Sequence, residues 1–137
     1  MLYDNVFKKW IKNNEGYKSH LYKDSVDKLT IGWGRNIQDK GVSFDEAELM
    51  FENDLKNAIN DIADFPWYIF APDDVKKALV HMSFNLGLPR LLTFKKMIQA
   101  LKNKNYRVAA MEVLDSKWAL QVGQRAKDIA LVIREAK

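Results

Sequence analysis

Three side chains with the chemistry for acid–base catalysis lie in one short stretch of the chain. They are the carboxyls of Glu15 and Asp24 and the hydroxyl of Thr30, in the spacing Glu-x8-Asp-x5-Thr. Two carboxyls at a cleft can break a glycosidic bond when they differ in protonation. One donates a proton to the leaving oxygen, while the other stays ionised and assists a water molecule or the positive charge on the sugar. The stretch is therefore a candidate site for cleaving a glycosidic bond.

The elements around the two carboxyls predict different environments for them. Residues 3–14 carry the apolar pattern of a helix, so Glu15 lies at a helix C-terminus. The helix dipole and partial burial there would disfavour the ionised form and suit Glu15 to be the acid. Asp24 lies in a polar turn, where it is expected to stay ionised. Thr30 lies on a predicted strand, residues 29–34, and its hydroxyl would point toward Asp24 and help to hold the attacking water.

Each of these residues also has an ordinary structural interpretation. A glutamate in the place of Glu15 is commonly the frayed end of a helix, Asp24 a turn residue and Thr30 a plain strand residue. Nearby aromatic side chains could lie flat against sugar rings, although most aromatic residues pack in a core; they are Tyr17, Tyr22, Trp33 and Phe84.

The rest of the chain predicts a mostly helical α+β protein with a small antiparallel sheet. Ser43 and Glu46 have the spacing of a capping box, which begins a long helix that ends near residue 64. Residues 36–42 are predicted to be a loop and residues 66–72 an aromatic connection. Further helices are predicted from their apolar periodicity over 73–84, 91–101, 106–114 and 121–135.

Composition excludes several kinds of chemistry. The 137 residues include no cysteine, so disulfides, a thiol nucleophile and cysteine-based zinc sites are ruled out. The net charge of +4 fits a mixed-charge surface as well as attraction to a polyanion such as nucleic acid or an anionic cell wall. No apolar stretch has the length of a membrane span, and the N-terminus lacks the apolar core of a signal peptide.

The stretch and its downstream context together resemble the phage-type lysozymes, the endolysins, which are glycoside hydrolases with muramidase activity. The active-site region of that family is similar to Glu15-Gly16, Tyr22-Lys23-Asp24 and Thr30-Ile31-Gly32-Trp33-Gly34. Later matches follow in the same order, at Asp45-Glu46-Ala47-Glu48 with Phe51 and Asp54, Met82 to Gly87, Ser116-Lys117-Trp118 and Arg125-Ala126-Lys127.

The resemblance implies one catalytic domain, residues 1–137, with a cleft between two lobes. It implies a sheet lobe over about 15–42, a connecting helix over about 43–64, and a helical lobe over about 65–137 that includes the helix 3–14. The implied reaction is hydrolysis of the β-1,4 bond between N-acetylmuramic acid and N-acetylglucosamine in peptidoglycan.

The resemblance also implies a role for individual residues. Glu15 takes the role of general acid, Asp24 that of base or stabiliser of the attacking water, and Thr30 that of positioning this water. Phe84 matches a cleft aromatic that binds substrate, and Arg125 an arginine that pairs with the catalytic glutamate. The configuration at the sugar would be inverted. No metal or cofactor is implied.

Three departures from the family pattern leave positions without a role. Arg35 stands where relatives often carry histidine, and it could contact Asp24 or substrate. The segment 36–43 is short, which predicts a smaller sheet lobe and a more open cleft. Met97 and Glu112 occupy positions that are polar in the clefts of longer relatives, and neither is assigned.

Other functions stay open at this stage. The same fold could act on chitin or chitosan oligomers, or could be a lytic transglycosylase. A non-catalytic protein could instead bind walls or disrupt membranes through its positive charge and C-terminal helix. Binding to nucleic acid is disfavoured because no recognised motif accompanies the charge. As a bacteriolytic phage enzyme, the protein is expected to be a monomer without stable membrane insertion. It would accumulate in the host cytoplasm and reach the wall through a separately made holin-type pore.

Overall fold

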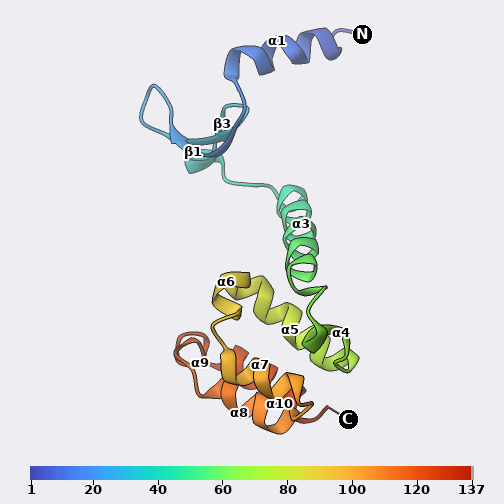
Figure 1. The fold of residues 1–137 in the computed structure, drawn as a ribbon. Coiled ribbons are helices and arrows are strands. Elements are labelled where there is room, and N and C mark those ends of the chain that lie inside the picture. Colours follow the sequence, from blue (N-terminus) through green and yellow to red (C-terminus); the bar gives the residue numbers. More distant parts are fainter. Residues whose placement is uncertain (137) are drawn as a thin grey trace. The chain divides into compact units, whose positions relative to one another are not determined.

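The structure, a computed structural model, describes residues 1–136. The chain divides into two compact units, Met1–Leu49 and Met50–Lys137, which we call the sheet unit and the helical unit. The division falls within a long helix, α3 (Phe44–Ile62) (Figure 1). The architecture is α+β and mostly helical, as the sequence predicts.

The sheet unit begins with a helix, α1 (Asn5–Glu15), close to the predicted range. Asp4 caps it by accepting a hydrogen bond from the backbone N–H of Phe7 at 2.9 Å. Gly16 ends it, with φ of 73° and its N–H bonded to the carbonyl of Lys12 at 2.8 Å. No residue of α1 is buried. The assignment of this helix to the helical lobe stays a prediction.

Three short strands follow and confirm the predicted antiparallel sheet. They are β1 (Lys18–Lys23), β2 (Leu29–Gly32) and β3 (Arg35–Asn36), in the order β1-β2-β3. Thr30 lies in the central strand, opposite Tyr22 on one side and Asn36 on the other. The register between β1 and β2 shifts between Lys18 and Tyr22. The central strand therefore places Thr30 at the middle of the sheet.

The prediction of a loop over residues 36–42 is wrong. A short helix, α2 (Ile37–Lys40), forms there and is capped by the Asn36 side chain, which accepts a hydrogen bond from the N–H of Asp39 at 3.1 Å. Gly41 ends it with φ of 62°. Four residues are too few to show helical periodicity in the sequence.

The predicted capping box at the start of α3 is confirmed. The N–H of Glu46 donates to Ser43 Oγ at 3.2 Å, and the N–H of Ser43 donates to Glu46 Oε1 at 2.8 Å. Two N–H groups at the helix start are thereby satisfied.

The helical unit packs several helices around one apolar core. The helices after α3 are α4 (Pro66–Ile69), α5 (Asp73–Leu86), α6 (Leu88–Leu91), α7 (Lys95–Lys102), α8 (Tyr106–Leu114), α9 (Lys117–Val122) and α10 (Gln124–Arg134). The largest fully buried side chains are Ile62, Leu79, Met82, Leu91, Met97, Ile133, Val75 and Val113. None of the helices within residues 1–136 is long and apolar enough to cross a membrane.

Three predicted boundaries in this unit are wrong. The aromatic connection contains a helix, α4, which begins at a proline as helices readily do. The helix predicted from residue 91 begins at Lys95, because Leu91 is the last residue of the preceding helix, α6. The helix predicted over 121–135 is shorter, because Gly123, with φ of 59°, separates α9 from α10.

Candidate active site

Glu15 is the last residue of α1, as predicted. Its side chain is exposed, so the sheet unit does not provide the predicted partial burial. Its carboxylate lies against Gly34: a Cβ added to that glycine would collide with Glu15 Oε2 and Cδ. Gly34 also has φ of 73°, which side chains rarely tolerate. Gly34 therefore lets the segment between β2 and β3 approach the carboxylate closely.

Asp24 is held rigidly by the turn between β1 and β2. Its Oδ1 accepts hydrogen bonds from the N–H groups of Val26 at 2.9 Å and Lys28 at 2.8 Å. Its own N–H donates to the carbonyl of Lys28 at 2.9 Å, and Asp27 turns the chain with φ of 66°. Asp24 is therefore a turn residue, as its type alone suggests. Within residues 1–136, no protein donor bonds its second oxygen, Oδ2, which leaves that oxygen able to accept a proton or a hydrogen bond.

Thr30 is connected to Asp24 through the backbone of Lys28. The Thr30 side chain is buried, and its hydroxyl donates to the carbonyl of Lys28 at 2.8 Å. The same carbonyl accepts the N–H of Asp24. A hydroxyl that donates one hydrogen bond can still accept another, but the Thr30 residue is only 2% exposed in the structure. The predicted water-positioning role of Thr30 stays a prediction.

An exposed aromatic pair lies close to Glu15 in the chain. The rings of Tyr17 and Trp33 are 5.0 Å apart, and their residues are 62% and 49% exposed. Lys12 Nζ lies 4.3 Å from the centre of the Trp33 ring, within the range of a cation–π interaction. Within the sheet unit these two aromatic residues thus present ring surface to solvent.

Arg35 has a partner that the sequence prediction missed. Its guanidinium makes a bidentate ion pair with Glu46, in which Nη1 lies 3.0 Å from Oε1 and Nη2 donates to Oε2. Nη1 also donates to the carbonyl of Gly41 at 3.0 Å. The suggested contact with Asp24 is not the one observed. The Arg35 hydrogen bond, followed by the hydrogen bonds from Ser43, lowers the pKa of Glu46 to about 2. Arg35 therefore ties β3 to the capping box of α3.

This ion pair predicts how stability should vary with pH. The pKa of Glu46 is lowered from 4.5 to about 2 in the folded chain, so ionised Glu46 stabilises the fold above about pH 4.5. That contribution is lost as the pH falls through about 2. Glu46→Gln still completes the capping box. We expect this variant to melt below the wild-type temperature at neutral pH and at the same temperature near pH 2.

Melting curves followed by circular dichroism between pH 2 and 7 measure this effect. The difference should be modest, because the two side chains are 37% and 42% exposed and solvent screens the pair. A difference that stays constant over the whole pH range would show that the carboxylate charge of Glu46 is not responsible.

The remaining predicted site residues lie in the helical unit. Phe84, on α5, is 40% exposed and packs against Phe51 with ring centres 5.6 Å apart. Arg125 is exposed on α10. Their predicted roles at the same substrate as Glu15 stay predictions.

The two unassigned positions, Met97 and Glu112, line one cavity. This cavity, of about 520 Å³, lies among α5 to α9 and is also lined by Trp118, whose indole N–H donates to Asn85 Oδ1 at 2.7 Å. Met97 is 1% exposed and belongs to the core, whereas Glu112 is half-buried. Within residues 1–136, no group of three or more histidine, aspartate and glutamate side chains is arranged to hold a metal ion.

The sheet unit thus carries two carboxylates with distinct surroundings. Glu15 is at a helix end with no side-chain hydrogen bond among the described residues, and Asp24 is fixed at Oδ1 by two N–H groups. Cleavage of a glycosidic bond uses one carboxyl as acid and one carboxylate as base or nucleophile, and the assignment of these roles to Glu15 and Asp24 stays a prediction.

Two comparisons with known proteins indicate the same family. The model of a family described as phage lysozyme matches residues 12–137, a range that includes every predicted site residue. "Probable T4-type lysozyme 2" of Dictyostelium discoideum is 28% identical over 155 residues, covering 91% of each chain. "Probable T4-type lysozyme 1" of the same organism is 28% identical over 156 residues, covering 92% of each chain.

Proposed function

This chain belongs to the phage lysozyme family and is a glycoside hydrolase, and on that premise we propose that it hydrolyses the glycan strands of bacterial peptidoglycan. The bond cleaved is the β-1,4 bond between N-acetylmuramic acid and N-acetylglucosamine. The observation that carries this proposal is the family match over residues 12–137, which contains the complete Glu-x8-Asp-x5-Thr stretch.

In this proposal Glu15 is the general acid. Its carboxyl donates a proton to the bridging oxygen as the bond to the anomeric carbon of the muramic acid breaks. The close approach of Gly34 supports this role, because it limits where the carboxylate can lie.

Asp24 assists the attacking water. The oxygen of that water bonds to the anomeric carbon, and a proton of the water passes to the Asp24 carboxylate. Oδ1 is occupied by the N–H groups of Val26 and Lys28, so Oδ2 is the oxygen that takes the proton. Thr30 accepts a hydrogen bond from the same water, and attack from the side opposite to Glu15 inverts the anomeric carbon.

The proposal also includes two residues of the helical unit. Phe84, 40% exposed, offers its ring to the sugars, and Arg125, exposed on α10, takes the role of the arginine that the family resemblance assigns to pairing with the catalytic glutamate. The predicted consequences belong to the same proposal: lysis of a bacterial host, release through a holin-type pore and action as a monomer.

Analysis of the reaction products tests this proposal. Purified peptidoglycan digested with the wild-type protein should yield fragments with N-acetylmuramic acid at the reducing end, identified by mass spectrometry after borohydride reduction. Proton NMR at early times should show the α-anomer of the new reducing end. Anhydromuramic ends would instead indicate a transglycosylase, and N-acetylglucosamine reducing ends would place the cut at the other glycosidic bond.

A further inference from the structure

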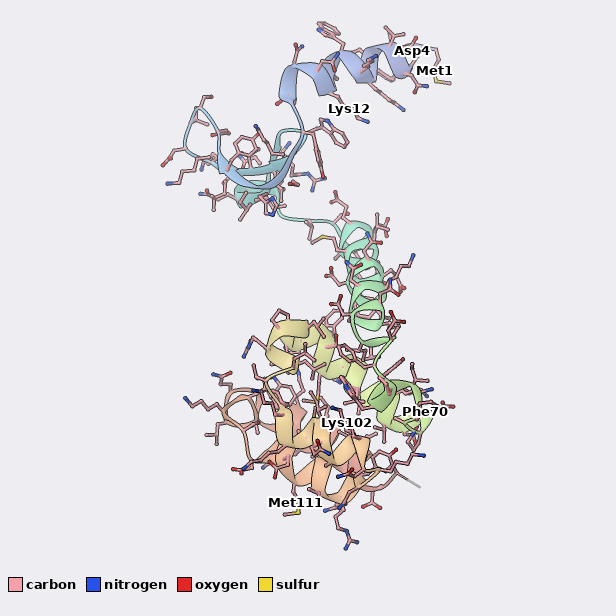
Figure 2. The ribbon with its side chains drawn as sticks, viewed as in Figure 1. Met1, Asp4, Lys12, Phe70, Lys102 and Met111 are labelled. Carbon is pink, nitrogen blue, oxygen red and sulfur yellow. The ribbon has the colours of Figure 1, made fainter. Side chains whose placement is uncertain are left out.

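The helical unit has a cavity at its surface whose lining includes none of the residues assigned to catalysis or substrate binding. It is a groove of about 350 Å³ between α4 and α7, lined by Pro66, Trp67, Phe70, Leu101, Lys102 and Lys104. We call it the α4–α7 groove. Figure 2 labels Phe70 at the end of α4 and Lys102 on α7.

Two of the residues that line this groove, Trp67 and Phe70, are aromatic. Trp67 is 5% exposed and belongs to the core, and its ring stacks on Phe65 with centres 5.0 Å apart. Phe70 is 69% exposed, although it directly follows α4. The exposed ring of Phe70 provides a flat apolar surface on which a pyranose ring can lie.

Two lysines border the aromatic surface, and one of them has an unusual backbone. Lys102 is in the last turn of α7, and Lys104 follows with φ of 56°. The chain turns there through bonds from the N–H of Lys104 to the carbonyl of Leu101 and from the N–H of Asn105 to the carbonyl of Ala100, at 3.0 and 2.9 Å. Glycine or asparagine is the common choice at such a position. A lysine there has an unfavourable conformation and adds a positive charge to the groove.

We propose that the α4–α7 groove is a second glycan-binding site, which holds a peptidoglycan strand without cleaving it. A sugar ring lies on Phe70, and Lys102 and Lys104 contact the carboxylates of the peptide that muramic acid carries. This inference rests on the proposed function, because it takes the substrate polymer as the ligand. A second attachment point on an insoluble polymer raises the effective concentration of the catalytic site near the next bond.

Retention on sedimented peptidoglycan tests the site in the Glu15→Gln background, in which digestion of the polymer is expected to be at least about a hundredfold slower. We expect Phe70→Ala to weaken retention about tenfold. Lys102→Gln should weaken it a few-fold, and this loss should shrink as salt is added. Lys104→Gly is the sharpest variant. It should weaken retention similarly while leaving the melting temperature unchanged or higher, since glycine suits the backbone there.

Matched variants outside the groove control for general effects. Met111→Ala removes an apolar side chain on α8 that is 62% exposed, and Lys127→Gln removes an exposed charge on α10. Both should retain wild-type binding. With Glu15 intact, Phe70→Ala should cleave short soluble glycan oligomers at the wild-type rate and clear whole peptidoglycan more slowly.

Two results would overturn the proposal. One is equal retention of the Phe70→Ala and Met111→Ala proteins on peptidoglycan. The other is weakened binding of Phe70→Ala to phosphatidylglycerol vesicles with unchanged retention on peptidoglycan, which would make the groove a membrane-binding surface. Failure of the proposed function gives a different result. If the wild-type protein cleaves no peptidoglycan, while Phe70→Ala still weakens retention, the catalytic proposal alone is contradicted.

Discussion

Replacing Glu15 with glutamine is expected to reduce peptidoglycan cleavage by at least about a hundredfold, the lower end of what a positioned general acid contributes. Glutamine has nearly the same shape but cannot donate a carboxyl proton to the leaving oxygen. The fold should be unaffected, because Glu15 is exposed and a negative charge at a helix C-terminus is unfavourable. The loss of turbidity of purified Gram-negative peptidoglycan, measured beside wild type, gives the ratio of rates.

Glu48→Gln is the matched control, since it makes the same chemical change at an exposed glutamate on α3. It should clear peptidoglycan at the wild-type rate. Clearing by the Glu15→Gln protein at the wild-type rate would exclude the acid role and would favour a binding or membrane-disrupting mechanism. If wild type itself does not clear the suspension, the proposed substrate is wrong.

Replacing Gly34 with alanine is expected to lower activity about tenfold to a hundredfold. The new methyl group would collide with the Glu15 carboxylate and displace it, and a catalytic group moved by about 1 Å can cost a hundredfold in rate. The backbone conformation adds a separate effect. At φ of 73°, an alanine should destabilise the fold by about 1 kcal/mol. Thermal melting and specific activity on the same preparation measure the two effects.

Gly32→Ala separates the collision from the backbone effect. Gly32 has φ of 70°, but nothing lies within 4 Å of a Cβ added there. This variant should be destabilised to a similar extent and should keep near wild-type specific activity below its melting temperature. Equal losses of activity in the two variants would show that the approach of Gly34 to Glu15 does not matter for catalysis.

The sequence predicted most reliably the elements whose signals are local. The capping box of Ser43 and Glu46 marks the start of α3, and the predicted helix 106–114 coincides with α8. The short helix α2 was missed because its only signals are the cap at Asn36 and the stop at Gly41. Gly123 was not recognised as a helix boundary because the apolar periodicity continues on both sides of it.

The candidate site shows the same contrast between local and distant interactions. The turn role of Asp24 follows from residue types two to four positions away. The structure shows this turn, in which Asp24 Oδ1 accepts hydrogen bonds from the N–H groups of Val26 and Lys28. The partner of Arg35 lies eleven residues along the chain, and no local pattern distinguishes Glu46 from any other acidic residue as that partner. The approach of the Glu15 carboxylate to Gly34 likewise joins residues nineteen positions apart, and no local pattern predicts it.

Lys28 connects Asp24 and Thr30 through its peptide groups alone. Its N–H holds Asp24 Oδ1, and its carbonyl receives both the N–H of Asp24 and the hydroxyl of Thr30. Among the described residues its side chain makes one polar contact, an exposed ion pair with Asp39 at 3.4 Å, which contributes little. Replacing Lys28 with alanine should therefore have little effect on activity, because the peptide groups remain. For the same reason, other side chains at this position would keep the hydrogen bonds that join Asp24 and Thr30. Among the common residues only proline, which lacks the N–H, would reveal how much the site depends on them.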